Sequence, residues 1–261
     1  MPPGDALASR RILLAHGYTS PFSDDFFIHH QFRTSADCPL FPRRETVPYL
    51  LEPHWTLIPN SSKDAEAVQD LWSQARPADC FGIQAYSLTP EWEFLYLAIH
   101  VASHKWETLR WIADIHDLCM SAPIDWTRVR EMAGQFGLEF VAESTLAVCK
   151  LLYDTPMPAI FSSATLPAGV RLFPRSLDPS EAWKAPLFYP KLLQRPADKL
   201  RWFVEMFFVA RVADHRFFDL PASLSFLYYV LRPLRLTCKW AWLSLAASVR
   251  RTGEWISFSG R

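Results

Sequence analysis

The fold class follows from residues 89–114, which read TPEWEFLYLAIHVASHKWETLRWIAD. The segment opens with Thr89-Pro90-Glu91, and a threonine followed by a proline and an acid is typical of a helix N-terminus. Apolar residues then recur at intervals of three or four, at Phe94, Leu97, Ala98 and Val101. This spacing predicts an amphipathic helix with its apolar face in a helical core.

The helical pattern continues on both sides of this segment. Asn60-Ser61-Ser62 offers N-caps for a preceding helix, and Asp125 can cap a helix that ends at Gly137. Phe140–Tyr153 forms another helix, and Pro196 begins one more. In that last helix we expect five apolar residues to point inward: Leu200, Phe203, Val204, Phe207 and Phe208.

The first 60 residues are mixed. Arg10–His16 reads as the end of a helix that stops at Gly17, whereas Phe26–Phe32 and Val47–Leu57 read as short strands. Prolines within the second strand limit it to a sheet edge, because proline cannot donate a ladder hydrogen bond. The fold class predicted is therefore α+β and predominantly helical, with a truncated sheet remnant followed by a helical body.

Four regions follow from these patterns and from the distribution of proline. They are a partial α/β element at 1–60, a helical domain at 61–155, a proline-rich connector at 156–195, and basic, aromatic helices at 196–261.

Composition excludes several classes of protein. The 27 basic and 27 acidic residues cancel, so a coat for double-stranded nucleic acid is not expected. Neither GxGxxG nor GxxxxGK[ST] occurs among the eight glycines, which counts against Rossmann and P-loop proteins. The five cysteines are scattered, as expected for reduced thiols in a cytoplasmic protein. No stretch of 18 uncharged apolar residues occurs.

The densest group of candidate metal-binding or phosphate-binding side chains surrounds two histidines. His100 and His104 are four residues apart, so they share a helix face and have the spacing of a zinc pair. The metalloprotease pattern requires Glu after the first histidine, where this chain has Val101. Two other interpretations stay open: polar residues satisfied at a helix contact, or a cationic face on which Lys105 and Arg110 bind phosphate and Asp114 orients one of them.

A single acid on the second predicted strand is the other candidate. Glu52 lies among apolar residues in Leu51–Leu57, a position where a metal ligand can be mounted. A lone strand glutamate also commonly faces solvent, so the position alone does not decide between the two.

Taken together, these motifs resemble the uncharacterised bacterial nucleotidyltransferases with a DNA polymerase β-like core. The resemblance rests on an E-x-H-W element, Glu52-Pro53-His54-Trp55, and on an H-x3-H-x-W-x2-L-x-W-x2-D string. That string is read here at His100, His104, Trp106, Leu109, Trp111 and Asp114.

The resemblance implies transfer of a nucleoside monophosphate from an NTP to an acceptor that the sequence does not name. Three carboxylates would hold two Mg²⁺ ions, and Glu52 corresponds to the third of them. Lys105 and Arg110 are then expected to bind phosphate. His100 and His104 would shape the pocket, and Asp114 and Trp106 would orient its groups.

The sequence departs from the family pattern in one respect. No Gly-Ser dipeptide and no Asp-x-Asp occurs, although the family carries both upstream of the glutamate. We therefore expect the N-terminal catalytic part to be missing and the chain to be incomplete or inactive by itself, because a hard dication needs several oxygen ligands.

Two alternatives belong to other functional classes. The missing acids fit a non-catalytic module that binds a nucleotide or a partner. Residues 220–261 carry six basic residues and one acid, a net charge of +5, which fits a partner chain or a membrane surface.

Overall fold

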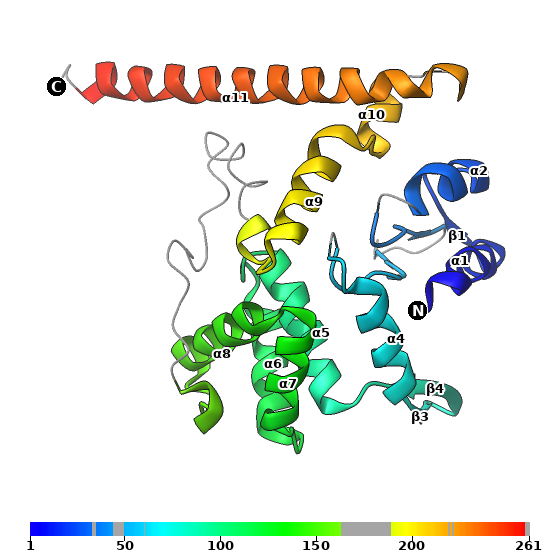
Figure 1. The fold of residues 1–261 in the computed structure, drawn as a ribbon, viewed down its shortest axis with the longest axis vertical. Helices are drawn as coiled ribbons and strands as arrows, with labels where there is room; N and C mark the ends of the chain where they lie inside the picture. Colours follow the sequence, from blue (N-terminus) through cyan, green and yellow to red (C-terminus); the bar gives the residue numbers. More distant parts are fainter. Residues whose placement is uncertain are drawn as a thin grey trace.

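The computed structural model describes residues 1–32, 35–43, 50–59, 61–162, 189–218, 220 and 222–258. Within these residues the protein is mostly helical and has two small antiparallel sheets, which fits the predicted α+β, predominantly helical class. Figure 1 shows an N-terminal unit beside a central helical body, with a long C-terminal helix across one end.

The N-terminal unit is built around a short sheet and a small core. Helix α1 (Ala6–Ala15) ends where Gly17 adopts a φ of +92°, as predicted. Strand β1 (Tyr18–Thr19) pairs with β2 (Phe41–Pro42). Short helix α2 (Asp24–Phe26) continues as the π-helix η2 (Phe27–Gln31). The core contains five buried residues: Ala6, Phe27, Cys38, Leu40 and Trp55.

The strand predicted at 26–32 is wrong, because these residues lie mostly in helices. The Ser23 hydroxyl accepts a hydrogen bond from the Phe26 N–H, and two aspartates follow it in the first turn. This cap satisfies an orphan helix donor and outweighs the strand preference of the aromatic residues.

The second predicted strand is only partly present. Residues 47–49 of that prediction lie outside the described residues. The rest is extended and forms two isolated bridges, from Leu51 to Leu40 and from His54 to Asp37. The Pro53 carbonyl accepts a hydrogen bond from the Cys38 N–H at 3.3 Å. Proline has no N–H, so Pro53 takes part in the pairing only as an acceptor.

A hairpin at residues 76–87 has no counterpart in the sequence prediction. Strands β3 (Arg76–Cys80) and β4 (Ile83–Ser87) are joined by Phe81 and Gly82, both with positive φ, as a two-residue hairpin turn requires. The Asp79 carboxylate accepts from the Gly82 N–H and holds the turn. The strands are too polar to show an apolar alternation.

Five helices form the central body and enclose the largest core. Three predicted boundaries are confirmed: Thr89 and Asp125 accept hydrogen bonds as N-caps, and Gly137 ends its helix with a φ of +73°. The helices are α4 (Asp64–Gln74), α5 (Pro90–Ser103), α6 (Leu109–Ser121), α7 (Trp126–Phe136) and α8 (Glu139–Tyr153).

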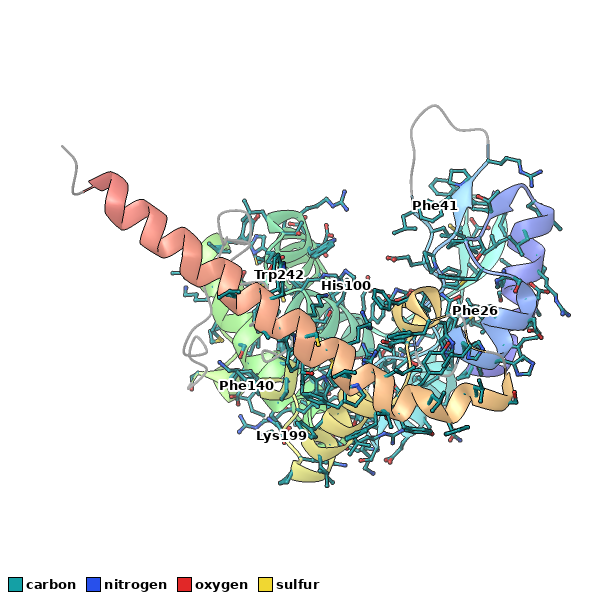
Figure 2. The ribbon with its side chains drawn as sticks, turned by 90° about the horizontal axis from the view of Figure 1, so that it is seen from above. Phe26, Phe41, His100, Phe140, Lys199 and Trp242 are labelled. Carbon is teal, nitrogen blue, oxygen red and sulfur yellow. The ribbon has the colours of Figure 1, made fainter. Side chains whose placement is uncertain are left out.

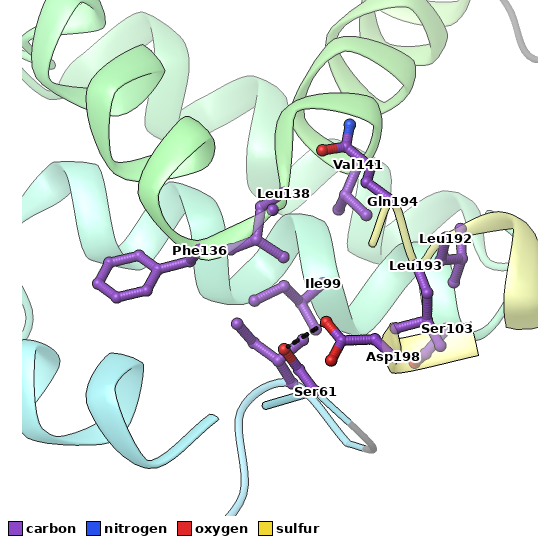
Figure 3. A pocket seen from close by; sticks show the side chains of 12 residues that line it. Ser61, Ile99, Ser103, Phe136, Leu138, Val141, Leu192, Leu193, Gln194 and Asp198 are labelled. Atoms are coloured by element: carbon purple, nitrogen blue, oxygen red, sulfur yellow. Dashed lines mark hydrogen bonds between the residues drawn. The ribbon is translucent and has the colours of Figure 1, made fainter. Parts of the chain in front are cut away.

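The start of α4 differs from the prediction. Its N-cap is Lys63 rather than a residue of the Asn60–Ser62 segment. The serines bind a distant element instead, because the Ser61 hydroxyl and the Ser62 N–H both donate to Asp198. Figure 3 shows this contact beside a small apolar cavity of about 20 Å³.

Apart from the 3₁₀ turn η1 (Pro3–Asp5), which precedes α1, the remaining elements follow α8 in the chain. They are the 3₁₀ turns η3 (Ala159–Phe161) and η5 (Tyr189–Lys191), α9 (Pro196–Phe208), α10 (Val212–Phe217), the 3₁₀ helix η6 (Ala222–Leu227) and α11 (Tyr228–Phe258). The last of these elements, α11, is a single helix of 31 residues. Residues 163–188 of the predicted connector lie outside the described residues.

The inward face predicted for α9 is wrong. Four of its members are exposed, namely Leu200, Phe203, Val204 and Phe208, whereas Asp198 and Trp202 are buried. The helix touches the body through its first turns and then extends beyond it (Figure 1), so most of its apolar face has no described covering element. The Phe207 ring meets Trp240 of α11, with centroids 5.3 Å apart.

A buried ion cluster joins α10 to α11. The Asp214 side chain is completely buried, and its carboxylate pairs with Arg232 and with Arg235, the latter at 2.6 Å. Arg232 also donates to the Met206 carbonyl of α9. Burial acts to raise the pKa of Asp214, but the Arg211 N–H and the two guanidinium groups outweigh it, so the pKa is lowered.

We expect Asp214→Ala to lower the free energy of unfolding by about 3–5 kcal/mol, because it leaves the buried Arg232 without a counter-charge. The control is Arg201→Ala, which breaks the exposed Arg201–Glu205 pair of α9 and should cost less than about 1 kcal/mol. Urea unfolding followed by circular dichroism measures both. Equal losses in the two variants would contradict the role given to the cluster.

Candidate functional site

The site begins with the extended segment around Glu52. Trp55 is buried against Phe27 and Phe32, with ring centroids 5.6 and 5.4 Å away. This contact fixes the segment to the N-terminal unit. Side chains alternate along an extended chain, so burial of Trp55 is consistent with the exposed position of Glu52.

A cleft of about 200 Å³ lies where this segment approaches the helical body. We call it the Glu52 cleft. Its walls include Glu52, His54, Leu57 and Trp72, together with Tyr96 of α5. The volume is below the range of pockets that enclose a small ligand, so this cleft can hold only part of a nucleotide.

The electrostatics indicate how the segment lies along α5. Burial raises the pKa of Tyr96, and the Glu52 charge raises it further. Burial lowers the pKa of His100, and His104 and His54 lower it further. Tyr96 and His100 are one helical turn apart, so Glu52 acts on one turn of α5 and His54 on the next.

His100 and His104 lie side by side, as their spacing predicts. Their ring centroids are 4.9 Å apart, and Trp111 of α6 lies 4.7 Å from His100 and 4.9 Å from His104. Figure 2 labels His100 on the side of the body toward the N-terminal unit. These three rings form a wall between α5 and α6 in which His100 and Trp111 are half-buried and His104 is exposed.

The turn between α5 and α6 has an unusual backbone. The Lys105 N–H donates to the Ala102 carbonyl and the Trp106 N–H to the Val101 carbonyl, which is the Schellman pattern of a helix end. Lys105 has a φ of +58° at the position where glycine is usual, and Trp106 follows with +55°. Such conformations cost about 1–2 kcal/mol per residue.

Burial of Trp106 accounts for this turn. Its side chain is completely buried, and the indole N–H donates to the Thr145 hydroxyl of α8 at 3.1 Å. Full burial of a large aromatic side chain is worth roughly 2–3 kcal/mol, and the hydrogen bond to Thr145 adds about 1 kcal/mol, so together they are similar in size to the cost of the two strained residues. The turn therefore fixes the backbone of Lys105, whose ammonium lies 3.8 Å from the Glu107 carboxylate.

Arg110 and Asp114 lie on the exposed side of α6. Neither forms an ion pair with a residue that the structure describes. The predicted orientation of Arg110 by Asp114 therefore has no salt bridge to support it among these residues. Neither these two residues nor Lys105, His100 and His104 line the Glu52 cleft. The structure thus joins Glu52 to α5 but leaves the two cations outside the cleft.

Comparison with known families identifies the region that carries these residues. The model of a family described as uncharacterised nucleotidyltransferase matches residues 1–154, more than half of the chain. The chain belongs to this family. No curated protein and no solved structure is significantly similar to it.

The matched part of this nucleotidyltransferase-family protein contains the N-terminal unit and the helices up to α8. Every predicted site residue, from Glu52 to Asp114, therefore lies within the family region. The helices α9, α10 and α11 lie outside it.

The described residues do not fit the two-Mg²⁺ site that the resemblance implies. Among them, no group of three His, Cys, Asp or Glu side chains lies together in a way that could hold a metal ion. Glu52 is a single carboxylate, and Mg²⁺ requires near-octahedral oxygen coordination. The Glu52 carboxylate can therefore supply one ligand of such a site but cannot form the site alone.

Two residues of this region are absent from the predicted site. His54 enters the sequence analysis only through the E-x-H-W element, and Tyr96 belongs to neither motif. Tyr96 is four residues before His100 on the same helix, so extending the histidine spacing by one turn would find it. The approach of His54 to His100 depends on the bridges at Leu51 and His54, which no local pattern reveals.

The lowered pKa of His100 predicts a pH dependence of stability. Because the pKa of His100 is lower in the folded protein, the unfolded chain binds a proton at His100 more tightly than the folded protein does. The contribution of neutral His100 to the free energy of unfolding is therefore complete above the ordinary histidine pKa and is lost as the pH falls through the lowered pKa. We expect His100→Gln to lose less stability than the wild type between pH 7.5 and pH 5. Urea unfolding at both pH values measures the difference.

The matched control is His16→Gln, which changes an exposed histidine at the end of α1. It should lose as much stability on acidification as the wild type. If the free energy of unfolding of His100→Gln falls between pH 7.5 and pH 5 as steeply as that of the wild type, the ring of His100 is solvated rather than half-buried.

Proposed function

We propose that this nucleotidyltransferase-family chain binds a nucleoside triphosphate along the face formed by α5 and the start of α6. The observation that carries the proposal is that Glu52, His54 and Tyr96 line one cleft, with His100 one turn further along α5, which brings two separate sequence motifs to one surface. The cleft beside them is too small to enclose the ligand, so the phosphates would extend over the exposed surface.

The two cations suit the phosphates in different ways. Arg110 is exposed and has no ion-pair partner among the described residues, so its planar guanidinium can take a phosphate bidentately. Lys105 is near Glu107, and binding of a triphosphate would draw its ammonium away from that carboxylate.

The histidines and Glu52 would have other roles. The lowered pKa of His100 favours the neutral ring, which can hydrogen-bond a ligand without adding charge, and His104 and Trp111 complete the wall that shapes the pocket. Trp106 would orient Lys105 through the buried turn. Glu52 would be one metal-binding carboxylate of a site that needs further acids.

Nucleotide transfer by this chain alone is therefore not part of the proposal. A single carboxylate cannot hold two Mg²⁺ ions tightly, and the acids of the Asp-x-Asp pattern are absent from the sequence. We propose binding of an NTP with Mg²⁺ but no measurable release of pyrophosphate. The nucleotide base and the acceptor are left open.

Calorimetric titration with Mg-ATP tests this proposal. We expect Arg110→Ala and Lys105→Ala each to weaken binding about tenfold, since a charge-assisted hydrogen bond contributes about 1.5 kcal/mol or more. Lys105→Gly is a second variant at the same position. It removes the cation while suiting the positive φ, so its loss of affinity would not come from unfolding.

The control for charge is Arg128→Ala, at an exposed Arg128–Glu131 pair on α7. It should bind Mg-ATP as the wild type does. Equal affinity in all variants would remove Lys105 and Arg110 from the site. Steady pyrophosphate release by the purified chain would show that it catalyses transfer by itself and would contradict the proposal.

A second candidate function rests on α11. Six exposed residues recur along one face of this helix with no charge among them: Val230, Leu234, Cys238, Ala241, Trp242 and Leu245. We call this face the outer stripe, and Figure 2 labels Trp242 on it. The helix is 31 residues long, yet the described part of the chain contains no helix apolar enough to cross a membrane.

We propose that the outer stripe lies on an anionic membrane surface. The net positive charge of segment 220–261 is the sign that an anionic surface attracts. Two of its arginines, Arg232 and Arg235, pair with Asp214 and are not available to lipid. The other four basic residues of segment 220–261 and its one acid leave +3, and each basic residue near such a surface contributes about 1 kcal/mol. Trp242 is the residue type that favours the membrane interface.

Co-sedimentation with phosphatidylserine vesicles tests this surface. We expect Trp242→Asp to reduce the bound fraction several-fold, and added salt to weaken binding of the wild type. Tyr86→Asp is the control, because Tyr86 is equally exposed on the β3–β4 hairpin. Sedimentation unchanged in Trp242→Asp would eliminate the membrane role, and dimerisation abolished by the same change would assign the stripe to a second copy.

A further inference from the structure

A second cleft, of about 420 Å³, lies between the N-terminal unit and the C-terminal helices. Its walls come from η2, from α9 and α10, and from the start of α11. It shares no lining residue with the Glu52 cleft. Its volume is within the range of small-molecule sites, whereas that of the Glu52 cleft is not.

Two histidines from distant parts of the sequence meet in this cleft. The ring centroids of His30 and His215 are 3.9 Å apart. Phe26 contacts both rings, at 5.0 and 5.6 Å, and Tyr228 lies 4.4 Å from His215. Burial lowers the pKa of His215, and the nearby His30 lowers it further, against the opposing effect of Asp214.

The charges around the histidines leave a positive surplus. Asp214 is buried and already neutralised by Arg232 and Arg235. Glu205, the acid in the cleft wall, pairs with Arg201 at 2.8 Å. Asp25 lies beside His29 at 3.4 Å.

Arg211 is the cation without such compensation. It lines the cleft at the start of α10, and its guanidinium forms no ion pair within the described part of the chain. An uncompensated arginine beside two histidines is a combination that favours phosphate, because the guanidinium binds it bidentately and imidazolium adds charge-assisted donors.

We propose that this cleft, which we call the Arg211 cleft, binds a phosphate-bearing small molecule. Arg211 holds the phosphate, and His30 and His215 contact it from the opposite side. Tyr228 and Tyr229 form an aromatic wall for the rest of the ligand. Bound phosphate would also link α10 to the N-terminal unit, since it bridges residues of both.

Such a site has a definite pH response. Protonation of His215 is opposed by burial and by the nearby His30 and is favoured by Asp214, and a bound anion would favour it further. Binding is therefore coupled to proton uptake, and affinity rises as the pH falls from 8 to 6. The proposal does not depend on the α5–α6 face, since it uses none of the same residues.

Calorimetric titration of the full chain with inorganic pyrophosphate tests the site. We expect Arg211→Gln to weaken binding at least tenfold and His215→Gln to weaken it several-fold at pH 6. Lys199→Gln is the matched control: it removes one positive charge from an exposed position of α9 outside the cleft. It should bind as the wild type does.

Sulfate is the second probe, because its own charge is constant between pH 6 and pH 8. We expect the wild type to bind sulfate several-fold more tightly at pH 6, and His215→Gln to lose most of this difference. Circular dichroism establishes that each variant is folded.

Two results would overturn the proposal: wild-type affinity for pyrophosphate in folded Arg211→Gln, or an equal loss in Lys199→Gln. Lys105→Ala separates this site from the nucleotide site. If that variant loses all pyrophosphate binding, the Arg211 cleft is refuted while the proposed nucleotide site stands. If Arg211→Gln loses it and Lys105→Ala does not, the Arg211 cleft is supported, and the nucleotide site is judged by the Mg-ATP titration alone.

Discussion

Complete burial of one face of α5 determines the position of the candidate site. Trp92, Phe94, Leu95, Ala98, Val101 and Ala102 have no accessible surface, because α6, α7 and α8 pack around them. A helix fixed so tightly cannot rotate, so Tyr96 and His100 must point away from this core. Trp106 locks the end of the same helix through Thr145. The chemistry proposed for this protein therefore stands on a rigid support, while Glu52 and His54 come to it from a smaller unit.

Local signals are sufficient for most helix boundaries of the helical body, but not for the start of α4, where Ser61 and Ser62 bind the distant Asp198. The caps at Thr89 and Asp125 and the glycine at 137 are short-range features, and each ends or begins a helix where the sequence indicates. The failures have two different causes, one local and one non-local. Residues 26–32 follow a serine cap that outweighs aromatic strand preference, and the prediction for the face of α9 rests on its apolar spacing alone. Apolar spacing reveals that a helix has a face, but it cannot reveal whether another element covers it.

The same distinction applies to the candidate site. The contact of His100 with His104 follows from a spacing of four, and the structure shows it. The approach of Glu52 to Tyr96 depends on pairing of Leu51 with Leu40 and of His54 with Asp37, and such non-local pairing leaves no periodic trace in the sequence. The Arg211 cleft is a stronger example, because His30 and His215 are far apart in the chain and neither belongs to a motif. Family membership covers residues 1–154 and so gives no information on α9, α10 and α11.

The attachment of α11 has a mechanical consequence. The described contacts that hold this helix lie between Tyr228 and Trp240, near its first end. Beyond them the helix continues for roughly 27 Å at 1.5 Å per residue. Asp214 holds the helix at Arg235, and the arm from there to Phe258 is roughly 35 Å at 1.5 Å per residue, so a tilt of about 10° would move the far tip by about 6 Å. Any event that shifts α10 by a small amount is thus amplified at the opposite end of the molecule (Figure 1).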